Sequence, residues 1–186
     1  MKAKLGKKAG GVVLELNRKD EPMINAAERT RPNSAFLIKR VLVPVDFSEC
    51  SRKALRYAVP FAEEHEAAIT LLYAVAPLYA ASEFAVPDYT ELQASMSAHG
   101  EKELAKLASE EIGGRVPFTL RVRTGQPTGV ITETAKELDA DLIVISTHGR
   151  TGLKHVLLGS VVENVVRRAP CPVLVVREDE HEFLAR

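Results

Sequence analysis

From about residue 38 onward, short apolar runs alternate with longer segments in which apolar residues recur every three or four positions. Runs of the first kind predict strands, and segments of the second kind predict amphipathic helices. The third run alternates apolar and polar side chains, which is typical of an edge strand with one wetter face. The predicted strands are Val41–Val45, Ile69–Val75, Val116–Val122, Leu142–Ile145 and Val173–Val176.

The first predicted helix begins at Ser48 or Ser51, since serine is a favoured cap residue. Pro60 lies within the helical pattern and should kink or divide this helix, because proline lacks the backbone donor. The next helix runs from about residue 88 to 111 and ends at a glycine pair. Its predicted inward residues are Leu92, Met96, Leu104 and Leu107.

Two further helices complete the pattern. One starts at Gln126–Pro127, and the other runs from Ser160 to Ala169. The inward stripe of the first consists of Val130, Ile131, Thr134, Ala135 and Leu138. Alternation of strands and helices predicts parallel strands joined by right-handed crossovers, with helices on both faces. The predicted fold class is therefore α/β, with an open, doubly wound parallel sheet.

The two ends of the chain depart from this pattern. Residues 1–37 lack sustained periodicity and are rich in Lys, Arg, Asn, Gly and Pro, which predicts a basic, largely flexible arm. Within the arm, Val12–Leu16 has the character of a short docking strand. The predicted domain covers residues 38–177, and residues 178–186 form a charged tail.

Composition narrows the class of protein. The chain has 186 residues, of which 46% are hydrophobic, and its 25 basic and 25 acidic residues cancel. This balance favours one domain with a sizeable core and argues against a nucleic-acid partner. Residues 1–40 carry ten Lys and Arg against four Asp and Glu, a net of +6, so the remainder carries −6. No apolar run approaches the roughly 20 residues that span a bilayer, so we expect a cytoplasmic protein without a membrane partner.

The two cysteines, Cys50 and Cys171, form no CxxC pair and have no zinc-ligand spacing. We interpret them as ordinary reduced thiols, and the sequence predicts no metal site held by side chains. Cys50 is the better redox candidate, because a helix N-terminus lowers the pKa of a thiol.

The most apolar strands, the first and the fourth, are predicted to lie side by side at the centre of the sheet. Ligands of such sheets bind beyond the carboxyl ends of the strands. Asp46 follows the first strand, where its carboxylate would accept a hydrogen bond from a ribose hydroxyl or an adenine amine, or would cap the next helix. Ser146 and His148 follow the fourth strand, and His148 would contact a ligand or hydrogen-bond locally.

Glycines in the loop after the fourth strand indicate phosphate binding. Gly149 and Gly152 allow positive φ and a close backbone approach to phosphate. Gly159 and Ser160 then open the last helix, whose N-terminal amides would attract an anion. Ser160 also fits a capping box with Glu163, a role that is compatible with a phosphate contact.

The same loop contains two basic residues for which the sequence allows two roles. Arg150 and Lys154 would either reach the phosphates or remain solvated. No Walker A pattern and no local nucleophile motif is present in the sequence.

Three segments together resemble the universal stress protein family. The first strand, Val41–Ser48, matches the family's I-L-V-P-x-D start. Ser146, Gly149, Gly159 and Ser160 match the spacing of the family's G-x2-G-x9-G-[S/T] motif, and Ala169–Val176 matches its last strand. The resemblance covers roughly residues 38–177.

The resemblance implies a five-stranded sheet in the order 3-2-1-4-5, of the adenine nucleotide α-hydrolase-like type. It also implies a homodimer that binds ATP, with Mg²⁺ or Mn²⁺ held by the phosphates. By position in the motifs, the adenosine pocket would be lined by Pro44, Val45, Asp46 and Ala74. The ribose and phosphates would be held by Gly149, Gly159, Ser160 and Val161.

Ser146 departs from the family motif, which has glycine at this position. If the position requires φ > 0, serine costs on the order of 1 kcal/mol or more. If the backbone is extended, serine is harmless, and its hydroxyl would donate to a phosphate.

The last strand gives a separate reason to expect a homodimer. Pro170 and Pro172 flank its start, which favours an edge position. An uncovered apolar edge over Val173–Val176 would aggregate. Pairing with the same strand of a second subunit covers it; the alternative is that the N-terminal arm covers it.

We therefore predict a homodimeric, ATP-binding stress-response module with at most slow ATP hydrolysis, and not an enzyme in the usual sense. The alternative is a nucleotide-free stress protein that acts through protein–protein interaction, a reading motivated by Ser146. An adenylyl-transferring enzyme would need an S-G-G-x-D type loop, which Asp46–Glu49 is not. The stress and the protein partners are not readable from the sequence.

Overall fold

The computed structural model describes residues 2–5, 12–15, 37–77, 89–149 and 159–178. The chain forms two compact units, Met1–Leu37 and Ile38–Arg186. In the first unit, β1 (Lys2–Leu5) pairs antiparallel with β2 (Val12–Glu15). The sequence predicted a strand at β2 alone and missed its partner. The predicted flexibility of the arm and the charged tail beyond Glu178 concern residues outside those described.

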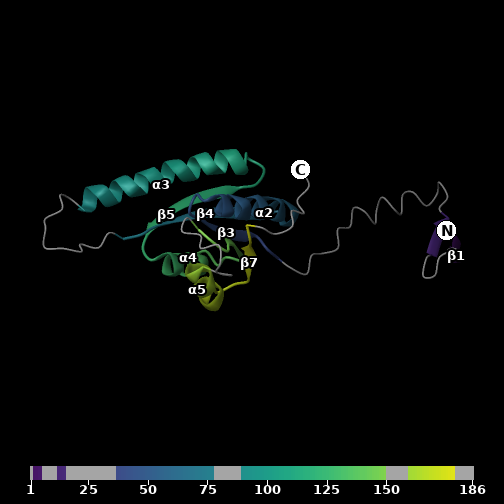
Figure 1. The fold of residues 1–186 in the computed structure, drawn as a ribbon. Coiled ribbons are helices and arrows are strands. Elements are labelled where there is room, and N and C mark those ends of the chain that lie inside the picture. Colours follow the sequence, from purple (N-terminus) through teal and green to yellow (C-terminus); the bar gives the residue numbers. More distant parts are fainter. Residues whose placement is uncertain (1, 6–11, 16–36, 78–88, 150–158, 179–186) are drawn as a thin grey trace. The chain divides into compact units, whose positions relative to one another are not determined.

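The second unit is built on a five-stranded sheet in the order β5-β4-β3-β6-β7 (Figure 1). Every neighbouring pair in this sheet is parallel. Counted from the first strand of the unit, the order is 3-2-1-4-5, which confirms the predicted fold class. The strands are β3 (Arg40–Val45), β4 (Ala68–Val75), β5 (Phe118–Thr124), β6 (Leu142–Ser146) and β7 (Val173–Val176).

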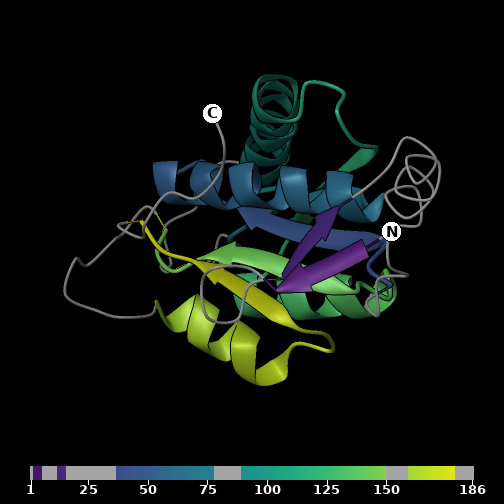
Figure 2. The same ribbon diagram turned by 90° about the vertical axis from the view of Figure 1, so that its right-hand side faces the viewer.

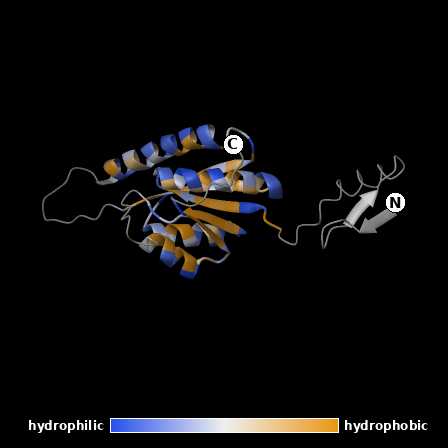
Figure 3. Cartoon of the chain, turned by 45° about the vertical axis from the view of Figure 1, so that its right-hand side comes forward, coloured by the Kyte–Doolittle hydropathy of each residue, from blue (hydrophilic) through white to orange (hydrophobic). Residues whose placement is uncertain are grey.

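In the described part of the chain, four helices cover the two faces of this sheet. Two of them, α2 and α3, lie on one face, and α4 and α5 lie on the other (Figures 1 and 2). The apolar sides of the helices face the strands, and their outer sides carry mostly polar residues (Figure 3). The helices are α2 (Glu49–His65), α3 (Tyr89–Glu111), α4 (Pro127–Glu137) and α5 (Ser160–Arg168).

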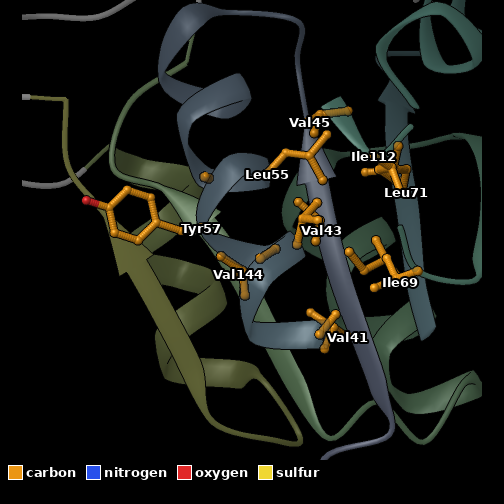
Figure 4. Close-up of a cluster of buried hydrophobic side chains, with 14 of the residues drawn as sticks. Val41, Val43, Val45, Leu55, Tyr57, Ile69, Leu71, Ile112 and Val144 are labelled. Atoms are coloured by element: carbon orange, nitrogen blue, oxygen red, sulfur yellow. The ribbon is translucent and has the colours of Figure 1, made fainter. Parts of the chain in front are cut away.

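Alternating side chains of the central strands belong to two separate hydrophobic cores, one on each face of the sheet. Val41 and Val43 point to the α2/α3 face, where they pack with Leu55 of α2 and Leu71 of β4 (Figure 4). Leu42 points to the opposite face. Residues 41–45 of β3 and all five residues of β6 are buried, so burial on both faces explains why these two strands are apolar throughout.

Helix α2 is continuous across Pro60, so of the two predicted effects the division is wrong and the kink stays a prediction. The donor that proline lacks would pair with the carbonyl of Arg56 four residues earlier. Arg56 is exposed, so this carbonyl belongs to the solvent side of the helix, where the loss of a hydrogen bond costs least.

Helix α3 follows the prediction only in its C-terminal half. Leu104 and Leu107 are fully buried, whereas Leu92 is 46% exposed and Met96 is half-buried. From residue 90 onward, Gly100 is the first buried residue of α3, so the first turns of the helix pack less closely against the core. The helix ends as predicted, at glycines with φ of 56° and 79°.

The positions of the edge strands and the inward stripe of α4 agree with the predictions. Strands β5 and β7 lie at the two edges of the sheet, as their sequences indicated. In α4, Val130, Ile131, Thr134 and Ala135 are buried, and Leu138 packs against the same cluster.

Candidate functional site

A cavity of about 470 Å³ opens at the carboxyl ends of β3 and β6, the two central strands. The chain leaves β3 towards α2 on one face and leaves β6 towards α5 on the other. The cavity therefore lies at the switch point of the sheet, where open α/β folds bind their ligands.

One wall of the cavity is apolar. It is formed by Leu72 and Ala74 of β4, Ile131 of α4, Ile145 of β6 and Val162 of α5. A planar, apolar group is suited to such a wall, because its burial removes apolar surface from water. The lining also carries Asp46, His148 and the start of α5.

Asp46 is held in place by the turn that it opens. Its Oδ1 accepts hydrogen bonds from the Ser48 amide at 3.1 Å and from the Ser48 hydroxyl at 2.6 Å. Ser48, and not Asp46, is the N-cap of α2, since its Oγ accepts from the amide of Ser51 at 3.2 Å. The alternative role of Asp46 as the helix cap is therefore wrong. The carboxylate instead orients the residue that caps the helix.

Position 149 has no room for a side chain beside the carboxylate of Asp46. A Cβ built on Gly149 would lie 3.3 Å from Asp46 Cγ and closer still to Asp46 Oδ2. Gly149 does not use the positive φ that glycine allows, and its role is the close backbone approach. The loops after β3 and β6 thus meet at this point, and only glycine permits the approach.

Ser146 occupies an extended position at the end of β6. Its buried hydroxyl donates to the carbonyl of His148 at 3.0 Å. Serine therefore replaces the motif glycine without backbone strain, and its hydroxyl closes the turn into the following loop.

Thr147 links three elements around the cavity, and only its place in the loop after the fourth strand pointed to it in the sequence. Its amide donates to Val176 of β7 at 2.9 Å, and its carbonyl accepts from Gly159 at 3.0 Å. Its Oγ1 lies 3.0 Å from His148 Nδ1. Thr147 is 2% exposed, so it anchors both the histidine and the start of α5.

Helix α5 begins at the cavity without a side-chain cap. Its N-cap is Gly159, with φ of −65°, and Ser160 is the first helical residue. The side chain of Glu163 instead accepts from Arg167 at 2.8 Å, so the predicted capping box is wrong. Free amides and the positive end of the helix dipole make this a place for an anion.

The structure gathers the predicted site residues around this one cavity. Arg150, Gly152 and Lys154 lie outside the described residues. The predicted residues that line the cavity are Pro44, Val45, Asp46, Ala74, Ser146, His148, Gly149, Gly159, Ser160 and Val161.

Much of the apolar wall was not predicted from the sequence. Leu72 is the register partner of Pro44, and Ile131 belongs to the predicted inward stripe of α4. The strand order together with that stripe was the signal that could have found them. Ser51 also lines the cavity, and its hydroxyl donates to the carbonyl of Ser48 at 2.9 Å.

Other candidate chemistry is sparse in the described part of the chain. Among these residues, no three His, Cys, Asp or Glu side chains gather closely enough to hold a metal ion. Cys50 is buried and Cys171 is half-buried, and burial raises the pKa of the Cys171 thiol. None of the described helices has the length and apolar character to cross a membrane.

The fold and cavity define an open, doubly wound α/β protein with a ligand site at the switch point of its sheet. Residues 37–177 match the model of the universal stress protein family. A universal stress protein of Methanocaldococcus jannaschii is 34% identical over 152 residues, which cover 81% of this chain and 88% of that protein. The chain belongs to the universal stress protein family.

Solved structures agree with this assignment. The universal stress protein UspA of Lactobacillus plantarum superposes with a TM-score of 0.65 at 30% identity, over 77% of this chain and 99% of that one. A universal stress protein solved in complex with cAMP has a TM-score of 0.55 at 27% identity, over 76% of this chain and 98% of that one.

Proposed function

We propose that this universal stress protein binds ATP in the cavity between β3 and β6 and acts as a regulatory module of a stress response. The observation that carries the proposal is that the N-terminus of α5, which has no side-chain cap, lines the same cavity as Asp46, Gly149 and an apolar wall. A relative that was solved with cAMP supports the ligand class.

The residues present suit an adenine nucleotide. The adenine ring would lie against Leu72, Ala74 and Ile131, and the Asp46 carboxylate would accept a hydrogen bond from the ribose or the adenine amine. The phosphates would lie at the amides after Gly159, beside the exposed Ser160. Mg²⁺ or Mn²⁺ would be held by the phosphate oxygens.

Ser146 no longer favours a nucleotide-free protein. Its extended backbone carries no penalty, and its side chain is bonded within its own loop. The alternative function, a nucleotide-free protein that acts through protein–protein interaction, is therefore left without the observation that motivated it.

The ATP proposal is tested by denaturing the purified protein and identifying co-bound nucleotide by mass spectrometry. We expect an adenine nucleotide in the wild type and less of it in Gly149→Ala. An empty wild-type protein that also fails to bind ATP at millimolar concentration would contradict the proposal.

The proposed module is a cytoplasmic homodimer with at most slow ATP hydrolysis. The support for dimerisation is β7, an edge strand on which Leu174 is 38% exposed. Pairing of the two β7 strands about a two-fold axis would satisfy both edges.

A further inference from the structure

Phe47 has an unusual backbone for a bulky residue. Its φ is 65°, in the left-handed region that disfavours any side chain with a Cβ. It lies between Asp46, which lines the cavity, and Ser48, which caps α2. Phe47 itself does not line the cavity. A strained residue of this kind persists only where its surroundings hold it.

The ring of Phe47 is held by Tyr73 of β4. The two ring centroids are 4.6 Å apart and the planes are tilted by 45°. Tyr73 is the register partner of Val45, the last residue of β3, so the contact forms at the start of the β3–α2 turn. Both side chains pack against the core under α2 and α3.

Tyr73 in turn is seated against helix α3. A Cβ built on Gly100 of α3 would lie 2.6 Å from Tyr73 Cδ1 and 2.9 Å from Tyr73 Cε1. Gly100 is buried, and its missing side chain is what lets the ring lie against the helix backbone. Three contacting residues thus connect α3 to the turn.

The left-handed residue determines where the carboxylate of Asp46 lies. It turns the chain so that both the amide and the hydroxyl of Ser48 reach Asp46 Oδ1. The other oxygen, Oδ2, lies directly against the backbone of Gly149 in the loop after β6. If Phe47 relaxed to an ordinary conformation, these two hydrogen bonds would break.

We propose that Phe47, Tyr73 and Gly100 form a buttress that positions Asp46 for nucleotide binding, so that α3 controls the affinity of a site that it does not line. This inference rests on the proposed function, and it assigns a positioning role to three residues outside the cavity.

The test is a double-mutant cycle on the full-length protein with ATP as the probe. Gly100→Ala displaces Tyr73, and we expect it to weaken ATP binding by about threefold to tenfold. In a Phe47→Gly background the same change should have no effect, because glycine adopts the left-handed turn without support from a ring. The control is Gly129→Ala in α4, where an added Cβ meets nothing within 4 Å.

A second readout does not depend on ATP. Hydrogen exchange of the Ser48 amide reports its bond to Asp46, and Gly100→Ala should accelerate it in the wild-type background alone. If the wild type binds no ATP, the proposed function fails, and this exchange rate still tests the buttress. If ATP binds and Gly100→Ala behaves like Gly129→Ala, or lowers affinity equally in both backgrounds, the buttress is wrong.

Discussion

At the scale of single residues, the carboxylate of Asp46 joins the two halves of the site. Its Oδ1 is bonded within the β3–α2 turn, and its Oδ2 lies against Gly149 in the loop after β6. The first contact is local, but the second cannot be read from the sequence, since Asp46 and Gly149 are about a hundred positions apart.

Gly149→Ala tests this contact directly. The added Cβ collides with a carboxylate that Ser48 holds in place, so either Asp46 or the loop must move. Overpacking of this kind costs about 1–3 kcal/mol, and we expect ATP affinity to fall about fivefold to 150-fold. Titration calorimetry measures the affinity, and Gly129→Ala is the matched control. Unchanged affinity in a folded Gly149→Ala protein would exclude Asp46 and Gly149 from the binding site.

A second residue contact predicts how stability depends on pH. Asp141 accepts from the side chain of Arg40 and from the amides of Lys39 and Arg40 at the start of the sheet. These hydrogen bonds, that of the Arg40 side chain first, hold the pKa of Asp141 below its ordinary value of 3.8. Its contribution to folding is therefore fully present above the unfolded value and is lost as the pH falls through the lowered native pKa.

Asp141→Asn should accordingly reduce the free energy of unfolding near neutral pH, and its deficit against the wild type should shrink as the solution is acidified. Urea unfolding at a series of pH values measures this difference. Asp139→Asn is the control, because Asp139 lies 3.5 Å from the same guanidinium but is 83% exposed. An equal loss of stability in both variants would show that Asp141 has no special role.

The sequence predicted the site residues better than it predicted their roles. Asp46, Gly149, Gly159 and Ser160 were found because they follow strands or open a helix, and all four line the cavity. Whether Ser160 or Gly159 caps α5 depends on a one-residue shift of the helix start, which a capping pattern cannot resolve. The positive φ of Phe47 and the close approach at Gly149 are tertiary effects without a local signal.

At the scale of elements, the segment formed by α5 and β7 lines the cavity at one end and forms an edge of the sheet at the other. The N-terminus of α5 faces the cavity, and β7 continues from the same helix to the edge of the sheet. Thr147 connects them, since its amide bonds Val176 and its carbonyl accepts from Gly159. A ligand at the start of α5 is therefore connected to the proposed dimer edge through a single residue, Thr147.

The two edges of the sheet allow a matched test of dimerisation. Leu174 of β7 and Leu120 of β5 are each 38% exposed. We expect Leu174→Asp to convert the dimer to a monomer, because it places a charge in a desolvated interface, while Leu120→Asp leaves the dimer intact. Sedimentation equilibrium measures the mass. A monomeric wild type, or dissociation by Leu120→Asp instead, would contradict dimerisation through β7.

Element prediction succeeded where local pattern and tertiary contacts agreed. The fully apolar runs of β3 and β6 and the stripe of α4 are buried as their periodicity indicated. Leu92 of α3 has the right helical spacing but remains exposed. Periodicity shows which side of a helix is apolar, but it does not show how far along the helix the core extends. Pro60 lies inside an unbroken helix for a similar reason, since the packing of α2 outweighs one missing hydrogen bond.

At the scale of the whole molecule, the family and the order of the strands locate the site. Because β3 and β6 are adjacent and their connections leave to opposite faces, a cavity between their carboxyl ends follows from topology. The sequence predicted this arrangement from strand alternation and from its resemblance to the family. Apart from Ala74, the apolar wall was missed because it combines β4 with α4, two elements that become neighbours only in the folded sheet.

Calorimetric titration of nucleotide-stripped protein with ATP and Mg²⁺ shows whether the cavity binds ATP. We expect saturable binding, close to one ATP per chain, that weakens markedly in Gly149→Ala and stays unchanged in Gly129→Ala. Absence of heat and of saturation at millimolar ATP, in a folded wild-type protein, would contradict ATP binding in this cavity.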